Sequence, residues 1–140
     1  MDTEKRKKIV IIEDDEHISK VYEIKLAKEN VDVKVFRDGP SGFAGIAIEI
    51  PDLILLDLMI PGRDGFWVIE EVKKKPELAN IPIIALSNLG QQTDRDRAMG
   101  LGAVDYLIKV DYSIGEVISK VKQYLEKNGG KGSNGNTERQ

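Results

Sequence analysis

The sequence contains no cysteine, which excludes disulfide bonds, thiolate metal sites and cysteine nucleophiles. It has one histidine, so a metal site built from several imidazoles is excluded as well. Aromatic residues make up only 6% of the chain, and no apolar run approaches the roughly 18 residues of a membrane span. Lys and Arg number 21 against 24 Asp and Glu, and the resulting net charge of -3 argues against nucleic-acid binding through bulk positive charge.

What is present suits one small globular domain, since the chain has 140 residues and 41% of them are apolar. The apolar stretch Ile9–Ile12 behind the basic N-terminus is too short for the core of a signal peptide, so we expect a cytoplasmic protein without a membrane partner. Residues 129–140 contain no apolar side chain, which predicts a flexible tail. We therefore expect a folded unit over residues 7–128, behind a flexible N-terminus of residues 1–6.

Short aliphatic runs alternate with amphipathic stretches along this unit. The runs KIVII, VDVKVF, DLILLD, IPIIAL and AVDYLIK are typical of strands. Helical patterns are expected at residues 17–29, 40–48, 65–75, 93–99 and 113–127. Repeated βα units of this kind predict an α/β fold, a (βα)5 doubly wound parallel five-stranded sheet in the flavodoxin-like order 2-1-3-4-5. Its ligand crevice lies at the carboxyl ends of strands one and three.

Acidic residues stand at the predicted ends of those two strands. Glu13 and Asp14 follow the first strand, and Asp57 interrupts the aliphatic run of the third. Carboxylates brought so close repel one another, and a hard cation with oxygen ligands such as Mg²⁺ relieves the repulsion. Glu13 and its acidic neighbours also suit a second interpretation, an N-cap cluster for the first helix. Asp57 is harder to explain structurally, because a charge inside a buried run needs a partner.

Other polar groups are expected at the same edge of the sheet. Lys109 follows the aliphatic residues of the fifth strand; its ammonium can snorkel to solvent or contact Asp57 and a bound anion. Ser87 ends the fourth strand and can donate its hydroxyl to a phosphoryl oxygen, although a Ser-Asn pair is also an ordinary transition to a loop. The glycine-rich turn after Asp57 fixes the backbone near Met59, whose carbonyl is a further candidate oxygen ligand.

Taken together, the segments IIEDD, LILLDLMIPGRDG, ALSNLG and GAVDYLIK resemble the receiver domain of two-component response regulators. The resemblance spans about residues 7–125 and implies that Asp57 is the phosphoacceptor. It also implies that Mg²⁺ is bound by Asp14, Asp57 and the backbone oxygen of Met59, with Glu13 acting through a coordinated water.

The remaining positions of the resemblance concern the switch. Ser87 and Lys109 match the family's phosphate-contacting hydroxyl and lysine, and Tyr106 matches its aromatic switch position. The implied function is that of a phosphoprotein in phosphorelay signal transduction, which accepts its phosphoryl group from a sensor histidine kinase or a histidine phosphotransfer protein. The implied output is a downstream protein partner, or a phosphorylation-dependent dimer, contacted through the fourth helix, fifth strand and fifth helix. No direct nucleic-acid contact and no turnover beyond Mg²⁺-dependent self-phosphorylation and self-dephosphorylation are expected.

One departure and three alternatives accompany this interpretation. The family usually has proline after the lysine, whereas Val110 follows Lys109, so we expect a trans peptide there. This departure keeps open a pseudo-receiver, which binds partners without phosphorylation. An aspartyl phosphatase is disfavoured because Met59 stands where such enzymes commonly carry a second Asp. A flavodoxin-type carrier is disfavoured because the acidic loop after strand one would repel the phosphate of its cofactor.

Overall fold

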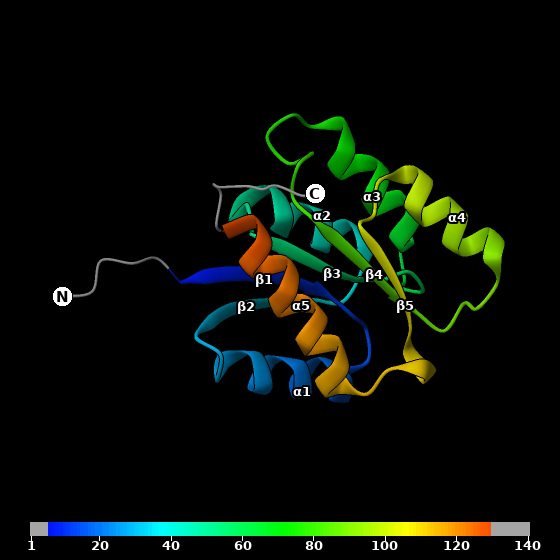
Figure 1. Ribbon diagram of the computed structural model, residues 1–140. Coiled ribbons are helices and arrows are strands. Elements are labelled where there is room, and N and C mark those ends of the chain that lie inside the picture. The colour runs from blue at the N-terminus through cyan, green and yellow to red at the C-terminus, as the bar shows by residue number, and fades with distance from the viewer. Residues whose placement is uncertain (1–5, 130–140) are drawn as a thin grey trace.

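The computed structural model describes residues 6–129, in which five strands and five α-helices alternate along the chain (Figure 1). The strands are β1 (Lys7–Ile12), β2 (Val31–Phe36), β3 (Leu53–Asp57), β4 (Ile83–Ser87) and β5 (Asp105–Ile108). The helices are α1 (Glu16–Ala27), α2 (Gly39–Glu49), α3 (Gly65–Lys74), α4 (Gln92–Leu101) and α5 (Ile114–Gly129). The strands are parallel and lie in the order β2-β1-β3-β4-β5, which confirms the predicted fold.

The sheet separates two hydrophobic cores, one on each face. Helices α1 and α5 cover one face, and α2, α3 and α4 cover the other (Figure 1). Side chains of a strand alternate between the faces, so Ile9 and Ile11 belong to the core under α1 and α5, while Val10 and Ile12 belong to the opposite core. Burial on both faces explains why these strands read as continuous aliphatic runs in the sequence.

Aspartate side chains cap the beginnings of the first three helices, α1, α2 and α3. Asp15 accepts a hydrogen bond from the backbone N–H of Ile18 and forms the N-cap of α1, so the capping interpretation of the acidic segment holds for this residue. Asp38 and Asp64 cap α2 and α3 in the same way. Each cap fixes the angle at which the chain leaves the sheet edge, and with it the position of the neighbouring functional residues.

The structure differs from the sequence-based expectation at the end of β5. The strand stops at Ile108, one residue earlier than predicted, and Lys109 opens a short 3-10 helix, η1 (Lys109–Asp111). Ile108 pairs with Ser87, the last residue of β4, so Lys109 has no strand left to pair with. Residues 6–129 contain no cis peptide, and the bond before Val110 is therefore trans as expected.

The predicted flexible segments, residues 1–6 and 129–140, fall almost wholly outside the described residues. Arg6 is described and lies 3.2 Å from Asp32, and Gly129 is the residue with which α5 ends. Among residues 6–129, the structure has no helix with the length and apolar character that crossing a membrane requires.

Candidate functional site

The register of the sheet brings four predicted site residues to one edge. Leu56 of β3 pairs with Ile12 of β1, so the residues that follow them, Asp57 and Glu13, leave the sheet side by side. Asp57 in turn pairs with Leu86 of β4, next to Ser87. Lys109 follows the partner of Ser87 on β5. Strand pairing alone therefore gathers side chains from four segments of the chain.

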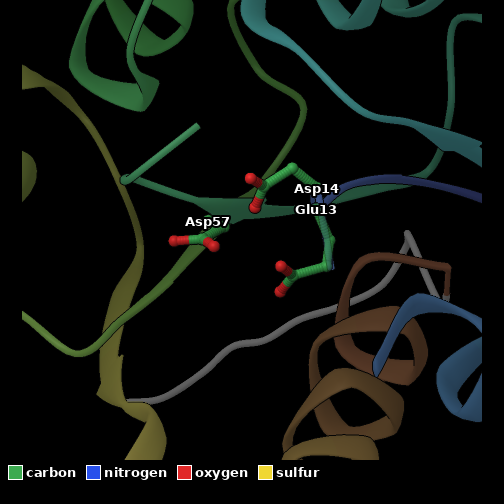
Figure 2. A group of neighbouring side chains, drawn as sticks. All are labelled: Glu13, Asp14 and Asp57. Atoms are coloured by element: carbon green, nitrogen blue, oxygen red, sulfur yellow. The ribbon is translucent and has the colours of Figure 1, made fainter. Parts of the chain in front are cut away.

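Three carboxylates form a cluster at this edge (Figure 2). One oxygen from each of Glu13, Asp14 and Asp57 lies within 4.8 Å of the others. Glu13 and Asp57 are only 2% and 5% exposed, whereas Asp14 is exposed to solvent. The cluster thus has a buried floor and an open side, and it concentrates more negative charge than buried carboxylates tolerate without a cation.

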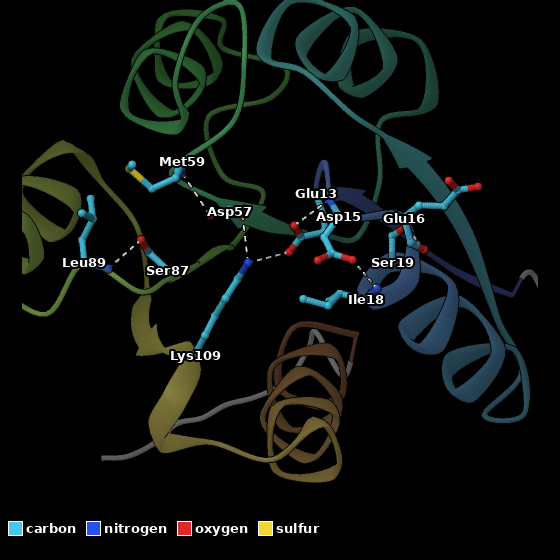
Figure 3. A network of polar contacts seen from close by, with 10 residues as sticks. All are labelled: Glu13, Asp15, Glu16, Ile18, Ser19, Asp57, Met59, Ser87, Leu89 and Lys109. Carbon is cyan, nitrogen blue, oxygen red and sulfur yellow. Dashed lines mark hydrogen bonds and ion pairs between the residues drawn. The ribbon is translucent and has the colours of Figure 1, made fainter.

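Lys109 supplies one such cation. Its ammonium lies 2.9 Å from Glu13 Oε1 and 2.9 Å from Asp57 Oδ2 (Figure 3). The contact with Asp57 agrees with the prediction that the lysine turns inward rather than snorkelling to solvent. The contact with Glu13 was not predicted, and its only signal in the sequence was the shared edge of the sheet.

The pKa values in this cluster follow from burial and pairing. Burial raises the pKa of Glu13 above its ordinary value, although hydrogen bonds from Lys109 and from the backbone of Asp15 act against the shift. The nearby charge of Asp57 raises the pKa of Glu13 further. Burial lowers the pKa of Lys109, but its two ion pairs outweigh that effect and the pKa ends above its ordinary value. Lys109 is consequently a fixed positive charge at physiological pH.

The backbone after β3 orients the Asp57 side chain. The N–H of Met59 donates to Asp57 Oδ1 at 3.0 Å, which leaves Oδ2 directed at Lys109. Within residues 6–129 no hydrogen bond uses the carbonyl oxygen of Met59, while its side chain is 58% exposed. Asp57 therefore has one oxygen held by the backbone and one by a cation.

Ser87 and Tyr106 meet at the loop after β4. The fully buried Ser87 accepts a hydrogen bond from the N–H of Leu89 at 3.0 Å. The hydroxyl of Tyr106 donates to the carbonyl of Leu89. Tyr106 is 3% exposed, and burial, with a contribution from the charge of Asp94, raises its pKa. Arg95 of α4 donates to the Tyr106 carbonyl at 3.2 Å, which ties β5 to that helix.

Tyr22 of α1 is a neighbour of the cluster that the sequence analysis missed. The residue is 4% exposed, and burial, followed by the negative charge of Glu13, raises its pKa to about 12. Its position four residues before the buried Leu26 is the signal that could have placed it on the inner face of the helix. The phenol remains protonated and contributes no further negative charge.

The sequence also matches the model of a known protein family. A family model described as the response regulator receiver domain matches residues 9–122. The chain belongs to the family of response regulator receiver domains, as its motifs predicted.

Solved structures of similar chains agree with the family model. The BeF3-activated N-terminal receiver domain of Klebsiella pneumoniae RstA is 30% identical with a TM-score of 0.76, over 84% of this chain and 97% of that one. The receiver domain of the Francisella response regulator 1452 is 28% identical with a TM-score of 0.79, over 87% and 98% of the two chains. The Mn²⁺-bound form of response regulator Rcp1 is 25% identical with a TM-score of 0.69, over 89% and 93%.

Proposed function

We propose that this receiver domain is a phosphorylation switch in which Asp57 accepts a phosphoryl group from a phosphohistidine on a sensor histidine kinase or a phosphotransfer protein. The observation that carries the proposal is the position of the Lys109 ammonium, 2.9 Å from a nearly buried Asp57 inside a cluster of three carboxylates. A purely structural ion pair would need neither the exposed Asp14 nor the excess of negative charge.

The donor set fits Mg²⁺. The cluster offers carboxylate oxygens within 4.8 Å of one another, one of them on the exposed Asp14, and the free Met59 carbonyl is a further hard oxygen. By the family resemblance, Asp14, Asp57 and the Met59 carbonyl would hold the ion directly, and Glu13 would act through a coordinated water. The bound ion would supply positive charge against the oxygens of the transferring phosphoryl group.

The chain's own groups would perform the transfer. A carboxylate oxygen of Asp57 attacks phosphorus and forms the new O–P bond, while the N–P bond breaks and its electron pair returns to the donor histidine. Lys109 neutralises charge on the phosphoryl oxygens, and the low exposure of Asp57 limits the water that competes with the donor. Beyond this self-phosphorylation and the later self-dephosphorylation, the domain would turn over no free substrate.

The hydrogen bonds after β4 support a switching role for Ser87 and Tyr106. Ser87 Oγ accepts from the Leu89 N–H and its hydroxyl also interacts with the Tyr106 side chain, an interaction that donation to a phosphoryl oxygen on Asp57 would break. Any movement of the loop is transmitted to Tyr106, whose hydroxyl is bound to the Leu89 carbonyl. The surface formed by α4, β5 and α5 would then change, and a downstream protein or a second copy of the chain would bind it.

The test is the intact mass of the chain after incubation with Mg²⁺ and acetyl phosphate. The wild type and an Asp32→Asn control, which removes an exposed carboxylate of β2, should each gain one phosphoryl adduct. Asp57→Asn should gain none, and a chelator should prevent the adduct in all variants.

A second measurement tests the switch in case acetyl phosphate does not serve as a phosphoryl donor for this domain. Beryllofluoride with Mg²⁺ should shift the NMR signals of Ser87 and Tyr106 in the wild type and leave those of Asp57→Asn unchanged. Two results together would overturn the switch: a wild type that gains no adduct, and an NMR spectrum that does not change on addition of beryllofluoride. They would favour a pseudo-receiver, the alternative that Val110 keeps open.

A further inference from the structure

A hollow with both polar and apolar walls lies at the opposite end of the sheet from Asp57, where β4 and β5 begin. Its volume is about 380 Å³, which falls in the range of roughly 300–1,000 Å³ typical of small-molecule sites. It is formed by the last turn of α3, the segment before β4, the residue before β5 and the end of α5. The lining residues that matter are Lys73, Asn80, Pro82, Val104, Tyr124 and Lys127.

Lys73 is the inner cation of this hollow. Its aliphatic stem lies against the backbone of Gly102, where there is no room for a Cβ atom, and its ammonium donates to the Ala79 carbonyl at 2.8 Å. No carboxylate of residues 6–129 pairs with it. Burial lowers the pKa of Lys73, so the protein bears a desolvation cost that an anion would offset.

Lys127 is the outer cation. Its ammonium lies 5.5 Å from the centre of the Tyr124 ring, and this cation–π contact is its sole interaction in the described part of the chain. The Tyr124 hydroxyl is itself engaged by Asp105, so the ring serves as a support rather than as a donor. The exposed amide of Asn80 adds N–H donors to the same hollow.

The charge of the lining distinguishes this hollow from two others among the described residues. Among the described residues that line it there are two lysines and no carboxylate. The hollow between α1 and α5 has lysines too, but Lys122 there lies 2.9 Å from Glu29. The hollow beside α3 is lined by Asp64 and Glu70 as well as by Arg63 and Arg97. Carboxylates therefore line both of those hollows, whereas none is among the described residues that line this one.

We propose that this hollow binds an organic phosphate. The phosphate would contact the ammonium groups of Lys73 and Lys127 and the amide of Asn80, since lysine suits phosphate as a compact charge with three donors. The apolar surface of Pro82 and Val104 would carry the organic part of the ligand. The site lies away from Asp57 and requires no covalent chemistry.

An NMR titration of the full ¹⁵N-labelled chain with AMP tests the proposal, with a chelator present to exclude metal-bridged binding at the acidic cluster. Saturable shifts are expected for the Asn80 side-chain amide and the Val104 N–H. Lys73→Gln should weaken binding about tenfold. Lys74→Gln is the matched control, because Lys74 is the next residue of α3 and pairs with Glu71 at the surface.

Lys127→Gln is a second variant whose exposed site at the end of α5 makes unfolding an unsuitable explanation for lost binding. It should also weaken AMP binding, and inorganic phosphate should bind the same residues more weakly than AMP. Equal effects of Lys73→Gln and Lys74→Gln would mean non-specific charge and overturn the site. Shifts produced equally by adenosine would overturn the role of the phosphate, and equal affinity for inorganic phosphate would overturn that of the organic part.

Discussion

The Lys109 ammonium lies 2.9 Å from the Asp57 carboxylate, although the two residues are 52 positions apart in the chain. The same ammonium is 2.9 Å from Glu13, so one cation serves two carboxylates whose side chains are 6% and 3% exposed. Carboxylates withdrawn from water to this degree require compensation by positive charge. The stability of this edge of the sheet and the chemistry proposed there therefore depend on the same lysine.

Lys109→Met should lower the free energy of unfolding by about 2–4 kcal/mol, because it leaves two buried carboxylates facing each other without their cation. Urea denaturation in the presence of a chelator measures the effect. Lys120→Met is the control: Lys120 is a partly exposed residue 3.8 Å from Asp105, and its loss should cost less than about 1 kcal/mol. A similar loss of unfolding free energy in the two variants would show that the Lys109 ion pairs stabilise the protein no more than a surface ion pair does.

Glu13→Gln should change how stability depends on pH. Because burial raises the pKa of Glu13, the folded chain retains a proton that the unfolded chain releases near pH 4.5. The stability that Glu13 contributes is full below that value and is lost as the pH rises through the higher pKa of the folded state. With metal chelated, the free energy of unfolding of Glu13→Gln should therefore rise relative to that of the wild type as the pH increases above 4.5.

Glu49→Gln gives the opposite sign and serves as the comparison. The hydrogen bond from Lys8 lowers the pKa of Glu49, so the stability from this residue is present above pH 4.5 and is lost as the pH falls through the lower pKa of the folded state. Relative to the wild type, Glu49→Gln should become more stable as the pH falls below 4.5. A Glu13→Gln difference that stays constant with pH would contradict the assigned burial effect.

The sequence was sufficient for the sheet and for the edge at which the site lies. Five aliphatic runs separated by amphipathic stretches leave few topologies, and parallel pairing then brings Glu13 and Asp57 together whatever the details of the loops. The position of Asp57 inside an aliphatic run was also informative, because a charged residue in a strand that is buried on both faces needs a partner.

What the sequence could not predict depends on contacts between distant residues. The Glu13–Lys109 pair depends on side-chain direction at two strand ends, and Lys109 itself lies in η1 because β4 offers no partner beyond Ser87. Likewise, nothing in the local pattern indicates that Leu89 would accept the hydroxyl of Tyr106. Helix ends shifted by one or two residues for a similar reason, since caps and turn bonds, rather than periodicity, fix where a helix stops.

Tyr106→Phe should lower the free energy of unfolding by about 1 kcal/mol and speed amide hydrogen exchange in the loop after β4. The cause is the loss of the hydrogen bond to the Leu89 carbonyl, which leaves a partly buried acceptor without its donor. Tyr112→Phe is the matched control, because no hydrogen bond in residues 6–129 uses the Tyr112 hydroxyl. Exchange in the loop should be the same in this control and in the wild type; equal acceleration in both variants would argue against the proposed coupling of loop and ring.

Gly65→Ala should destabilise the protein by about 1–3 kcal/mol, since the new Cβ would lie 2.6 Å from the Leu58 Cα and 2.9 Å from the Asp57 carbonyl oxygen. Both are backbone atoms, so the turn that follows Asp57 has to move. Gly100→Ala is the control: its Cβ would meet nothing within 4 Å on an exposed helix, and it should stabilise the protein by about 0.5–1 kcal/mol. Thermal unfolding compares the two variants, and a neutral Gly65→Ala would mean that the backbone carrying Asp57 yields easily and does not hold the carboxylate in place.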